Sequence, residues 1–520
     1  MSSTLKYPVG VQSFEVLRED GFLYVDKTAL IYKLAQQHIC FLCRPRRFGK
    51  SLTISTLEAY FTGKRALFDG LQIMSLETEW KQYPVFHLDF NGTQYRSNAD
   101  LIAVLDSNLQ KWERIYGRIA QPDAPLGYRF AYVIEQANLI NGNRCVVLVD
   151  EYDKPLLDVL GEKAENENRE TLRGFFSAFK LVDSKLRFVF LTGVTKFSQV
   201  SVFSGFNQPY DISMSSEFES ICGITEAELH TVLKSSVEKF ASQRAEETER
   251  VFNAFKSMYD GYHFSPAMTD IYNPFSLFSA FNDGNLRNFW FSTGTPTYLL
   301  RLINDHKVDM NYLLSEEYPD DYFMDYRANS EDPLAMLYQS GYLTIKQVLR
   351  QPDGSNLYKL DYPNVEVKRG FVTMLCNNYF AAREDTGGVA QKISRCLMNN
   401  KMDEMLMLLN QFLSSIDYEM RKDKEYQFQY TVYLLFSLVS SFGVSVEQHN
   451  SQGRADLIVT TPDYIYIFEF KLDGSADTAL QQIKDRQYAT PFLTDPRAIV
   501  KIGASFGRKS GIIDEWKVVY

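Results

Sequence analysis

The stretch Arg44-Pro45-Arg46-Arg47-Phe48-Gly49-Lys50-Ser51 decides the fold of the N-terminal part of this chain. An apolar run of strand length, residues 38–43, precedes it, and a helical pattern follows it to residue 61. A strand, a loop and a helix in this order form a phosphate-binding loop, whose backbone N–H groups and helix N-terminus surround phosphates. The lysine reaches the β and γ phosphates, and the following hydroxyl binds Mg²⁺. The sequence therefore predicts a nucleotide site at Gly49, Lys50 and Ser51.

One residue of this loop departs from the usual pattern. Arg44 stands where G-x-x-x-x-G-K-[ST] has its first glycine, so the turn is made without the residue that tolerates any φ. Taken alone, the stretch could also be a basic loop that caps an ordinary helix. A second motif is needed to distinguish a nucleotide site from a basic loop of this kind.

That second motif is the apolar strand 145–149, which ends in Asp150-Glu151. A buried parallel strand carries its terminal carboxylates to the open edge of the sheet. Asp150 is predicted to hold Mg²⁺ through water, and Glu151 to polarise the attacking water. The alternative, an acidic pair at a helix N-terminus, explains less, because the loop and the acidic strand occur together in the expected order.

A third strand, residues 186–191, ends in Thr192-Gly193-Val194-Thr195. Thr192 or Thr195 is predicted to lie beside the γ-phosphate, although a threonine at the end of a strand also serves as a cap. The cofactors predicted for this part of the chain are ATP and Mg²⁺.

Composition restricts the remaining possibilities. A chain of 520 residues exceeds what one hydrophobic core supports, so several domains are expected. Its net charge of −10 confines any contact with nucleic acid to a local surface. The six cysteines show no paired framework, which fits a reducing cytoplasm, and the lone C-x-x-C at Cys40 and Cys43 lacks the further ligands of a zinc site. No apolar run approaches a membrane span, and no leader is visible, so we expect a cytoplasmic protein without a membrane partner.

The middle of the chain is expected to be helical. Thr225 and Glu228 form a capping box, and a charged helical pattern runs to about Lys256, as in a lid that follows an ATPase sheet. Residues 337–345, the turn 352–354 and residues 358–360 predict a helix followed by a hairpin, similar to a winged helix. Such a wing contacts either DNA or protein, and the acidic residues before it leave both open.

The C-terminal part carries a second kind of chemistry. Residues 454–459 and 464–471 read as strands, and alternation places Glu469 and Lys471 on one face. With Asp456 on the neighbouring strand, two carboxylates can share a hard cation such as Mg²⁺ while the lysine orients water for attack on a phosphodiester. The alternative is a solvated Glu-x-Lys ion pair. Glu425 on an upstream helix and Gln482 on a downstream helix are predicted to complete the site.

Two family resemblances follow from these residues. The stretches 14–34, 44–51 and 149–155, continued by 259–262, 272–275 and 289–296, resemble the AAA-ATPase-like family of bacterial proteins, in which Arg44 is the normal residue. Glu425, 453–456, 469–471 and 482–488 resemble the PD-(D/E)xK nuclease superfamily, which commonly follows that ATPase-like domain. Gln487 departs from the glycine that its relatives tend to have, which affects the helix end and leaves the metal site intact.

The resemblances imply a complete set of site residues. The predicted nucleotide contacts are Arg46, Arg47, Phe48, Gly49, Lys50, Ser51, Leu52, Asp150 and Thr192. The predicted catalytic residues are Glu151, Glu425, Asp456, Glu469, Lys471 and Gln482. The predicted metal ligands are Ser51, Asp150, Asp456 and Glu469.

The whole sequence predicts an α/β protein in four parts. These are a P-loop domain with a parallel sheet flanked by helices (1–224), a helical lid (225–300), a helical and winged-helix-like region (301–400) and a nuclease-like α/β domain (401–520). The expected function is an ATP-regulated, metal-dependent nuclease that acts on DNA more readily than RNA, with oligomers possible. The alternatives are a nucleotide-dependent switch whose inactive nuclease fold grips DNA, and an ATPase whose C-terminal domain is purely structural.

Overall fold

The computed structural model describes residues 5–121, 123–196, 209–292, 310–324, 333–380, 386–415, 424–442, 444–448 and 455–520. The chain forms two compact units, Met1–Glu366 and Val367–Tyr520. The division falls inside helix α19 (Val365–Phe380). The finer division into four parts stays a prediction.

A parallel sheet forms the centre of the first unit. Its strands are β1 (Ile39–Cys43), β2 (Val85–Asp89), β3 (Cys145–Asp150), β4 (Leu186–Gly193) and β5 (Tyr210–Asp211). They lie in the order β2-β3-β4-β1-β5, and all four neighbouring pairs are parallel. The continuous apolar runs of β1, β3 and β4 are buried almost throughout, as expected of strands covered on both faces.

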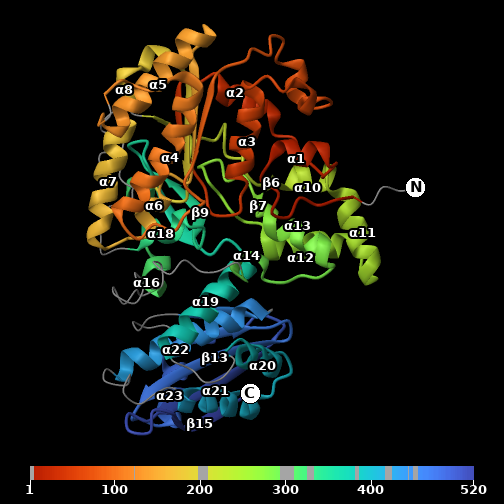
Figure 1. Ribbon diagram of the computed structural model, residues 1–520. Helices are drawn as coiled ribbons and strands as arrows, with labels where there is room; N and C mark the ends of the chain where they lie inside the picture. The colour runs from red at the N-terminus through yellow and green to blue at the C-terminus, as the bar shows by residue number, and fades with distance from the viewer. Residues whose placement is uncertain are drawn as a thin grey trace. The chain divides into compact units, whose positions relative to one another are not determined.

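Helices cover both faces of this sheet (Figure 1). On one side lie α2 (Thr28–Ala35) and α3 (Lys50–Phe61), and α1 (Phe14–Glu19) packs against α3. The other side carries α4 (Asn98–Tyr116), α5 (Leu126–Asn141), α7 (Lys163–Phe176) and α8 (Ala178–Leu181), while α6 (Lys154–Leu157) directly follows the β3 end. The predicted P-loop architecture of a parallel sheet between helices is confirmed.

A helical subassembly follows the sheet within the same unit. It contains β6 (Ile224–Thr225), α10 (Glu226–Thr231), α11 (Lys234–Arg244), α12 (Thr248–Tyr259), β7 (Ile271–Tyr272), α13 (Pro274–Asp283) and α14 (Phe289–Ser292). The predicted capping box is confirmed: the Thr225 hydroxyl caps α10, and Glu228 Oε2 accepts a hydrogen bond from the Thr225 amide at 2.8 Å. An apolar core that includes Val237, Phe255 and Phe281 joins α11, α12 and α13.

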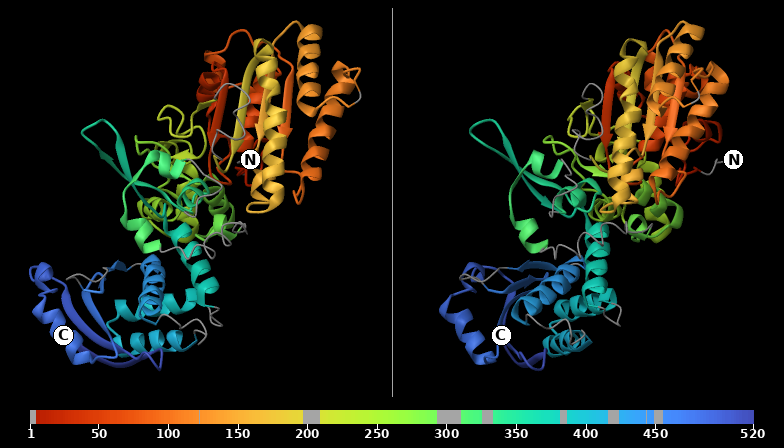
Figure 2. Two further views of the ribbon diagram at one scale, coloured as in Figure 1. Left: turned by 90° about the vertical axis from the view of Figure 1, so that its left-hand side faces the viewer. Right: turned by 60° about the vertical axis from the view of Figure 1, so that its left-hand side comes forward.

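The first unit ends with the predicted helix and hairpin. After α16 (Met310–Ser315), β8 (Tyr318–Pro319) and α17 (Asp320–Met324), helix α18 (Leu334–Gln339) leads into β9 (Thr344–Arg350) and β10 (Asn356–Asp361). The antiparallel pairing of β9 with β10 confirms the hairpin, which is visible in Figure 2. Residues 293–296 of the family-like stretch lie outside the described residues.

The second unit is a mixed sheet with helices. Its strands are β11 (Ser445–Gln448), β12 (Leu457–Thr460), β13 (Tyr464–Leu472), β14 (Ala498–Phe506) and β15 (Ile513–Val519), in sequential order. Only β13 and β14 are parallel. The helices are α19 from residue 367 onward, α20 (Thr386–Met398), α21 (Met402–Ser415), α22 (Lys424–Val439) and α23 (Ala476–Asp485). Within the described ranges, no helix has both the length and the apolar character needed to cross a bilayer.

Candidate nucleotide site and candidate metal site

The phosphate-binding loop has the predicted strand, loop and helix. Gly49 lies directly before α3. Its φ is +100°, a backbone conformation that residues with a side chain rarely adopt. Lys50 begins the helix and is buried, and its Nζ donates to the carbonyl oxygens of Arg44 at 3.1 Å and Pro45 at 3.2 Å. The lysine ammonium therefore lies within the loop, where an anion would replace the two carbonyl partners.

Arg44 is a structural member of this loop. Its guanidinium is 1% exposed, donates to the carbonyl oxygens of Cys43 at 2.9 Å and Ser213 at 2.7 Å, and lies 4.2 Å from the ring centroid of Phe264. The left-handed backbone positions of the loop are Arg47, at φ +68°, and Gly49. The loop consequently does not require glycine at position 44, which explains how it forms despite the departure from the usual pattern.

The ends of β3 and β4 bring Asp150 and Thr192 together. Strand β4 lies between β1 and β3, so its carboxyl end separates the loop from the acidic strand. The Thr192 hydroxyl donates to Asp150 Oδ1 at 2.7 Å, and both side chains are buried. Thr195 instead donates to Asp153 Oδ2 at 2.7 Å. Of the two predicted threonines, Thr192 is the one that contacts the acidic strand end.

Glu151 has a backbone in the left-handed region and a carboxyl whose pKa is raised. Its φ is +50°, a strained value for a residue with a side chain. Burial raises the pKa of its carboxyl, while the charges of Lys50 and Arg46 lower it. Glu151 is therefore held close to the cationic loop, and it lines the same cavity as Lys50.

A cavity of about 690 Å³ lies next to the loop. The predicted residues that line it are Arg46, Arg47, Phe48, Gly49, Lys50, Ser51, Leu52 and Glu151. Its wall continues over the N-terminal segment at Tyr24 and over α13 at Phe275, whose ring lies 4.9 Å from the Arg47 guanidinium. Asp150 and Thr192 are buried and are not lining residues. The volume suits a nucleotide-sized ligand.

Asp153 is a further residue that supports the site. Its Oδ2 accepts hydrogen bonds from the amides of Val194 at 3.0 Å and Thr195 at 2.6 Å, which ties the chain after β3 to the end of β4. At Gly193 an added Cβ would lie 2.6 Å from Asp153 Oδ1, so this close approach requires glycine. The signal in the sequence was a further aspartate two positions after Glu151, but its role depends on the pairing of strands.

Strand β13 positions the second candidate site. Ile465 and Ile467 pack with Ile483 of α23, whereas Phe468 contacts Phe436 of α22 on the other face. Because side chains alternate along a strand, Glu469 and Lys471 continue the face that carries α23. The distance of 3.0 Å between Lys471 Nζ and Glu469 Oε1 confirms that the two side chains share a face.

Asp456 and Glu469 lie opposite each other on neighbouring segments of the sheet. Leu457 pairs with Phe468, so Asp456, the residue before β12, lies opposite Glu469. Its Oδ2 accepts from the Phe470 amide at 2.8 Å. Burial raises the pKa of the Glu469 carboxyl, and the charge of Asp456 raises it further. Two mutually repelling, largely buried carboxyl groups are a suitable pair of ligands for a hard cation.

The remaining oxygen of Glu469 supports this interpretation. Glu469 is 2% exposed, and its Oε2 has no hydrogen-bond partner of normal geometry among the described residues. A buried carboxylate oxygen without a partner is costly unless a proton or a cation compensates it. The donor set consequently fits a divalent cation.

Helix α23 contributes the predicted glutamine. Gln482 Oε1 accepts a hydrogen bond from Lys471 Nζ, and Gln482 Nε2 lies 3.3 Å from the Tyr488 hydroxyl. The structure thus brings Asp456, Glu469, Lys471 and Gln482 into one cluster. Glu425 lies on α22, but its side chain is outside the described residues.

Comparison with known proteins identifies the families of both domains. A protein of Azotobacter chroococcum mcd 1, described as "Uncharacterized protein in vnfD 5'region", is 34% identical over 521 residues and covers 98% of each chain. The family described as "Predicted AAA-ATPase" matches residues 8–203, and the PD-(D/E)XK nuclease superfamily matches residues 423–516. The chain belongs to this AAA-ATPase-like family. This AAA-ATPase-like protein thus joins a nucleotide-binding type of domain to a nuclease-like one.

Two solved structures show a more distant likeness. The ORC1 protein of Aeropyrum pernix, solved in complex with DNA, is 11% identical to the AAA-ATPase-like protein, with 67% of this chain and 92% of that chain covered and a TM-score of 0.23. The ORC2 protein of Aeropyrum pernix, solved as ADPNP–ADP complexes, is 13% identical, with 69% and 92% covered and a TM-score of 0.23.

Proposed function

We propose that the first unit binds and hydrolyses Mg-ATP, and that the second unit cleaves nucleic acid with the aid of a divalent cation under control of the nucleotide. The single observation that carries the cleavage half is the buried Oε2 of Glu469, opposite Asp456, which has no hydrogen-bond partner of normal geometry in the described part of the chain. Controlled cleavage rests on the joining of the two domains in one chain.

In the nucleotide half, each predicted residue has a distinct task. The Lys50 ammonium would exchange its two carbonyl partners for phosphate oxygens. Ser51 and Asp150 would hold Mg²⁺, and the hydrogen bond from Thr192 would orient the Asp150 carboxylate. Glu151 would orient the attacking water. The exposed guanidinium groups of Arg46 and Arg47 line the cavity and would meet phosphate charge.

In the cleavage half, Asp456 and Glu469 would hold Mg²⁺ or Mn²⁺, which supplies charge stabilisation at the scissile phosphate. Lys471 would orient the attacking water, and Gln482 would keep the lysine in place through their hydrogen bond. DNA is the favoured substrate over RNA. The net charge of −10 requires that the contact surface be local.

One observation favours a second candidate function. Lys471 is already engaged by both Glu469 and Gln482, which is also the arrangement of a purely structural ion pair. In that case the chain would be a nucleotide-dependent switch whose nuclease-like domain binds nucleic acid without cutting it.

A cleavage assay on single-stranded and duplex DNA and RNA, with Mg²⁺ or Mn²⁺ and with or without ATP, tests the proposal. We expect cleavage that requires the cation and changes when ATP is added. Lys50→Ala should abolish ATP turnover and the response to ATP, whereas Glu151→Gln should retain ATP affinity and slow turnover. Binding without cleavage, reduced by Lys471→Ala, would favour the switch. Normal ATP turnover by Lys50→Ala would contradict the nucleotide site.

A further inference from the structure

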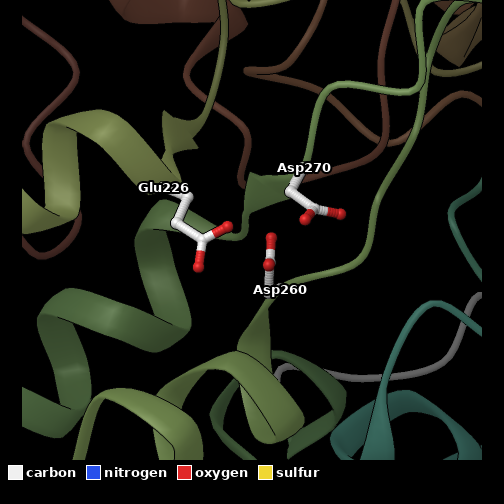
Figure 3. A group of neighbouring side chains, drawn as sticks. All are labelled: Glu226, Asp260 and Asp270. Carbon is white, nitrogen blue, oxygen red and sulfur yellow. The ribbon is translucent and has the colours of Figure 1, made fainter. Parts of the chain in front are cut away.

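Three carboxylates meet in the helical subassembly of the first unit (Figure 3). Glu226 is the first residue of α10, Asp260 follows α12, and Asp270 precedes β7. One carboxylate oxygen from each lies within 4.8 Å of the others. The pairing of β6 with β7, and the bridge between Tyr262 and Ile271, hold the three segments in place. The cluster is therefore built from three separate segments of the chain.

Asp260 is the unusual member of the cluster. It is 1% exposed, and neither of its carboxylate oxygens has a hydrogen-bond partner of normal geometry among the described residues. Figure 3 shows its carboxylate directed into the space between Glu226 and Asp270. Burial raises the pKa of this carboxyl to about 7, although the neighbouring Gly261 amide lowers it. A buried carboxylate aimed at two others requires a compensating positive charge, from a proton or from a cation.

The protein's own cations supply only part of that charge. Lys256 Nζ lies 2.7 Å from Glu226 and 3.3 Å from Asp270, and its side chain is 45% exposed. Lys346 Nζ donates to the carbonyl oxygens of residues 261 and 363. Within the described part of the chain, neither lysine forms an ion pair with Asp260.

The imidazole of His263 fixes one carboxylate from outside the cluster. Its Nε2 lies 2.8 Å from Asp270 Oδ1, and its Nδ1 lies 2.7 Å from the carbonyl oxygen of Ile345. Carboxylates that bind a metal are usually themselves hydrogen-bonded by neighbouring groups, and His263 is such a neighbour of Asp270.

We propose that Glu226, Asp260 and Asp270 form a binding site for a hard divalent cation. All three ligands are carboxylate oxygens, the type that Mg²⁺, Ca²⁺ and Mn²⁺ prefer. The half-exposed Lys256 ammonium moves into solvent when the cation enters. None of the three carboxylates lines the nucleotide cavity, so this cation is separate from the one that accompanies ATP.

The position of the site indicates that the cation stabilises the structure next to the phosphate-binding loop. Directly before β6, the Gly223 amide donates to the carbonyl oxygen of Phe48 at 3.1 Å. After Asp260, the Tyr262 ring packs against the Phe48 ring with centroids 4.8 Å apart. The cation joins the two segments that support Phe48, and it thereby stabilises the subassembly beneath the phosphate-binding loop.

Mn²⁺ binding to the full chain tests this site directly. The chain should carry Asp456→Asn and Glu469→Gln, which remove the C-terminal carboxylate pair, and it should be stripped of metal and kept free of nucleotide. Electron paramagnetic resonance should then show one tightly bound Mn²⁺ per chain. Adding Asp260→Asn should weaken this binding about tenfold or more, because it removes a charged ligand. Absence of bound Mn²⁺, or equal binding after Asp260→Asn, would overturn the proposal.

A second variant keeps the test decisive if Asp260→Asn does not fold. Lys256→Met removes the competing ammonium, so it should tighten Mn²⁺ binding and increase the rise in thermal midpoint that Mn²⁺ causes. If Lys256→Met binds no Mn²⁺, the lysine itself is the cation of the cluster and the proposal fails. Asp283→Asn, which changes an ion-paired carboxylate on α13, is the matched control and should leave binding unchanged.

Discussion

The buried carboxyl of Glu366 should make the stability of the first unit dependent on pH. Glu366 is 1% exposed, and its Oε1 accepts a hydrogen bond from the Trp290 amide at 2.7 Å. Burial raises its pKa from the ordinary value of 4.5 to about 7, although the Ser276 hydroxyl and the Trp290 amide lower it. The Trp290 indole donates to the carbonyl oxygen of Arg46 at 3.0 Å, so this carboxyl also supports the phosphate-binding loop.

The size of the effect follows from linkage between folding and proton binding. Between the ordinary pKa and the raised one, the folded chain holds a proton that the unfolded chain has released. The free energy of unfolding then falls by about 1.4 kcal/mol per pH unit, or about 3 kcal/mol across the whole interval. This contribution is fully present below pH 4.5 and is lost as the pH rises through 7. Glu366→Gln stays neutral, so it should be more stable than wild type at pH 8 by up to about 3 kcal/mol.

Denaturant unfolding at several values between pH 5 and pH 8 measures this difference. Tryptophan fluorescence is suitable, because Trp80, Trp112 and Trp290 belong to the first unit and only Trp516 to the second. Wild type and Glu366→Gln should separate progressively as the pH rises. Glu249→Gln, which changes an exposed glutamate, is the control and should follow wild type. Parallel curves for wild type and Glu366→Gln would show that this carboxyl does not make the stability depend on pH.

Two further substitutions probe single features of the sites. Thr192→Val leaves Asp150 Oδ1 without its hydrogen-bond donor, and it should lower the free energy of unfolding by about 1–3 kcal/mol and slow ATP hydrolysis. An unchanged denaturation midpoint and hydrolysis rate would show that the contact is dispensable. Gln487→Gly should raise the stability of the second unit by about 0.5–1 kcal/mol, because φ at this residue is +54°. Arg486→Gly, at an ordinary helical φ, should lower that stability in the same fluorescence assay of Trp516.

The sequence predicted the features of the fold and of the sites that depend on local patterns. Continuous apolar runs identified β1, β3 and β4, and alternation placed Glu469 and Lys471 on one face. The pairing of Thr225 with Glu228 depends on residues three apart, so it was also predictable.

The sequence could not predict features that depend on distant contacts. The burial of Arg44 needs acceptors from residue 213 and a ring from residue 264, and the role of Asp153 needs the end of β4 beside it. The choice of Thr192 over Thr195 follows from the register of β3 against β4, which pairs Val149 with Leu191 and which no local pattern determines. The buried carboxyl of Asp260 lies in a cluster of three carboxylates, whose three segments meet only in the folded chain.

Metal-dependent cleavage by the second unit is tested by comparing Glu469→Gln with wild type, with each preparation assayed for both activities. The substitution removes the charge of the buried carboxylate that lies opposite Asp456 while keeping the shape of the side chain. The proposed cation site predicts that wild type cleaves DNA in the presence of Mn²⁺, that Glu469→Gln does not, and that both hydrolyse ATP at the same rate. Cleavage by Glu469→Gln at the wild-type rate would contradict it.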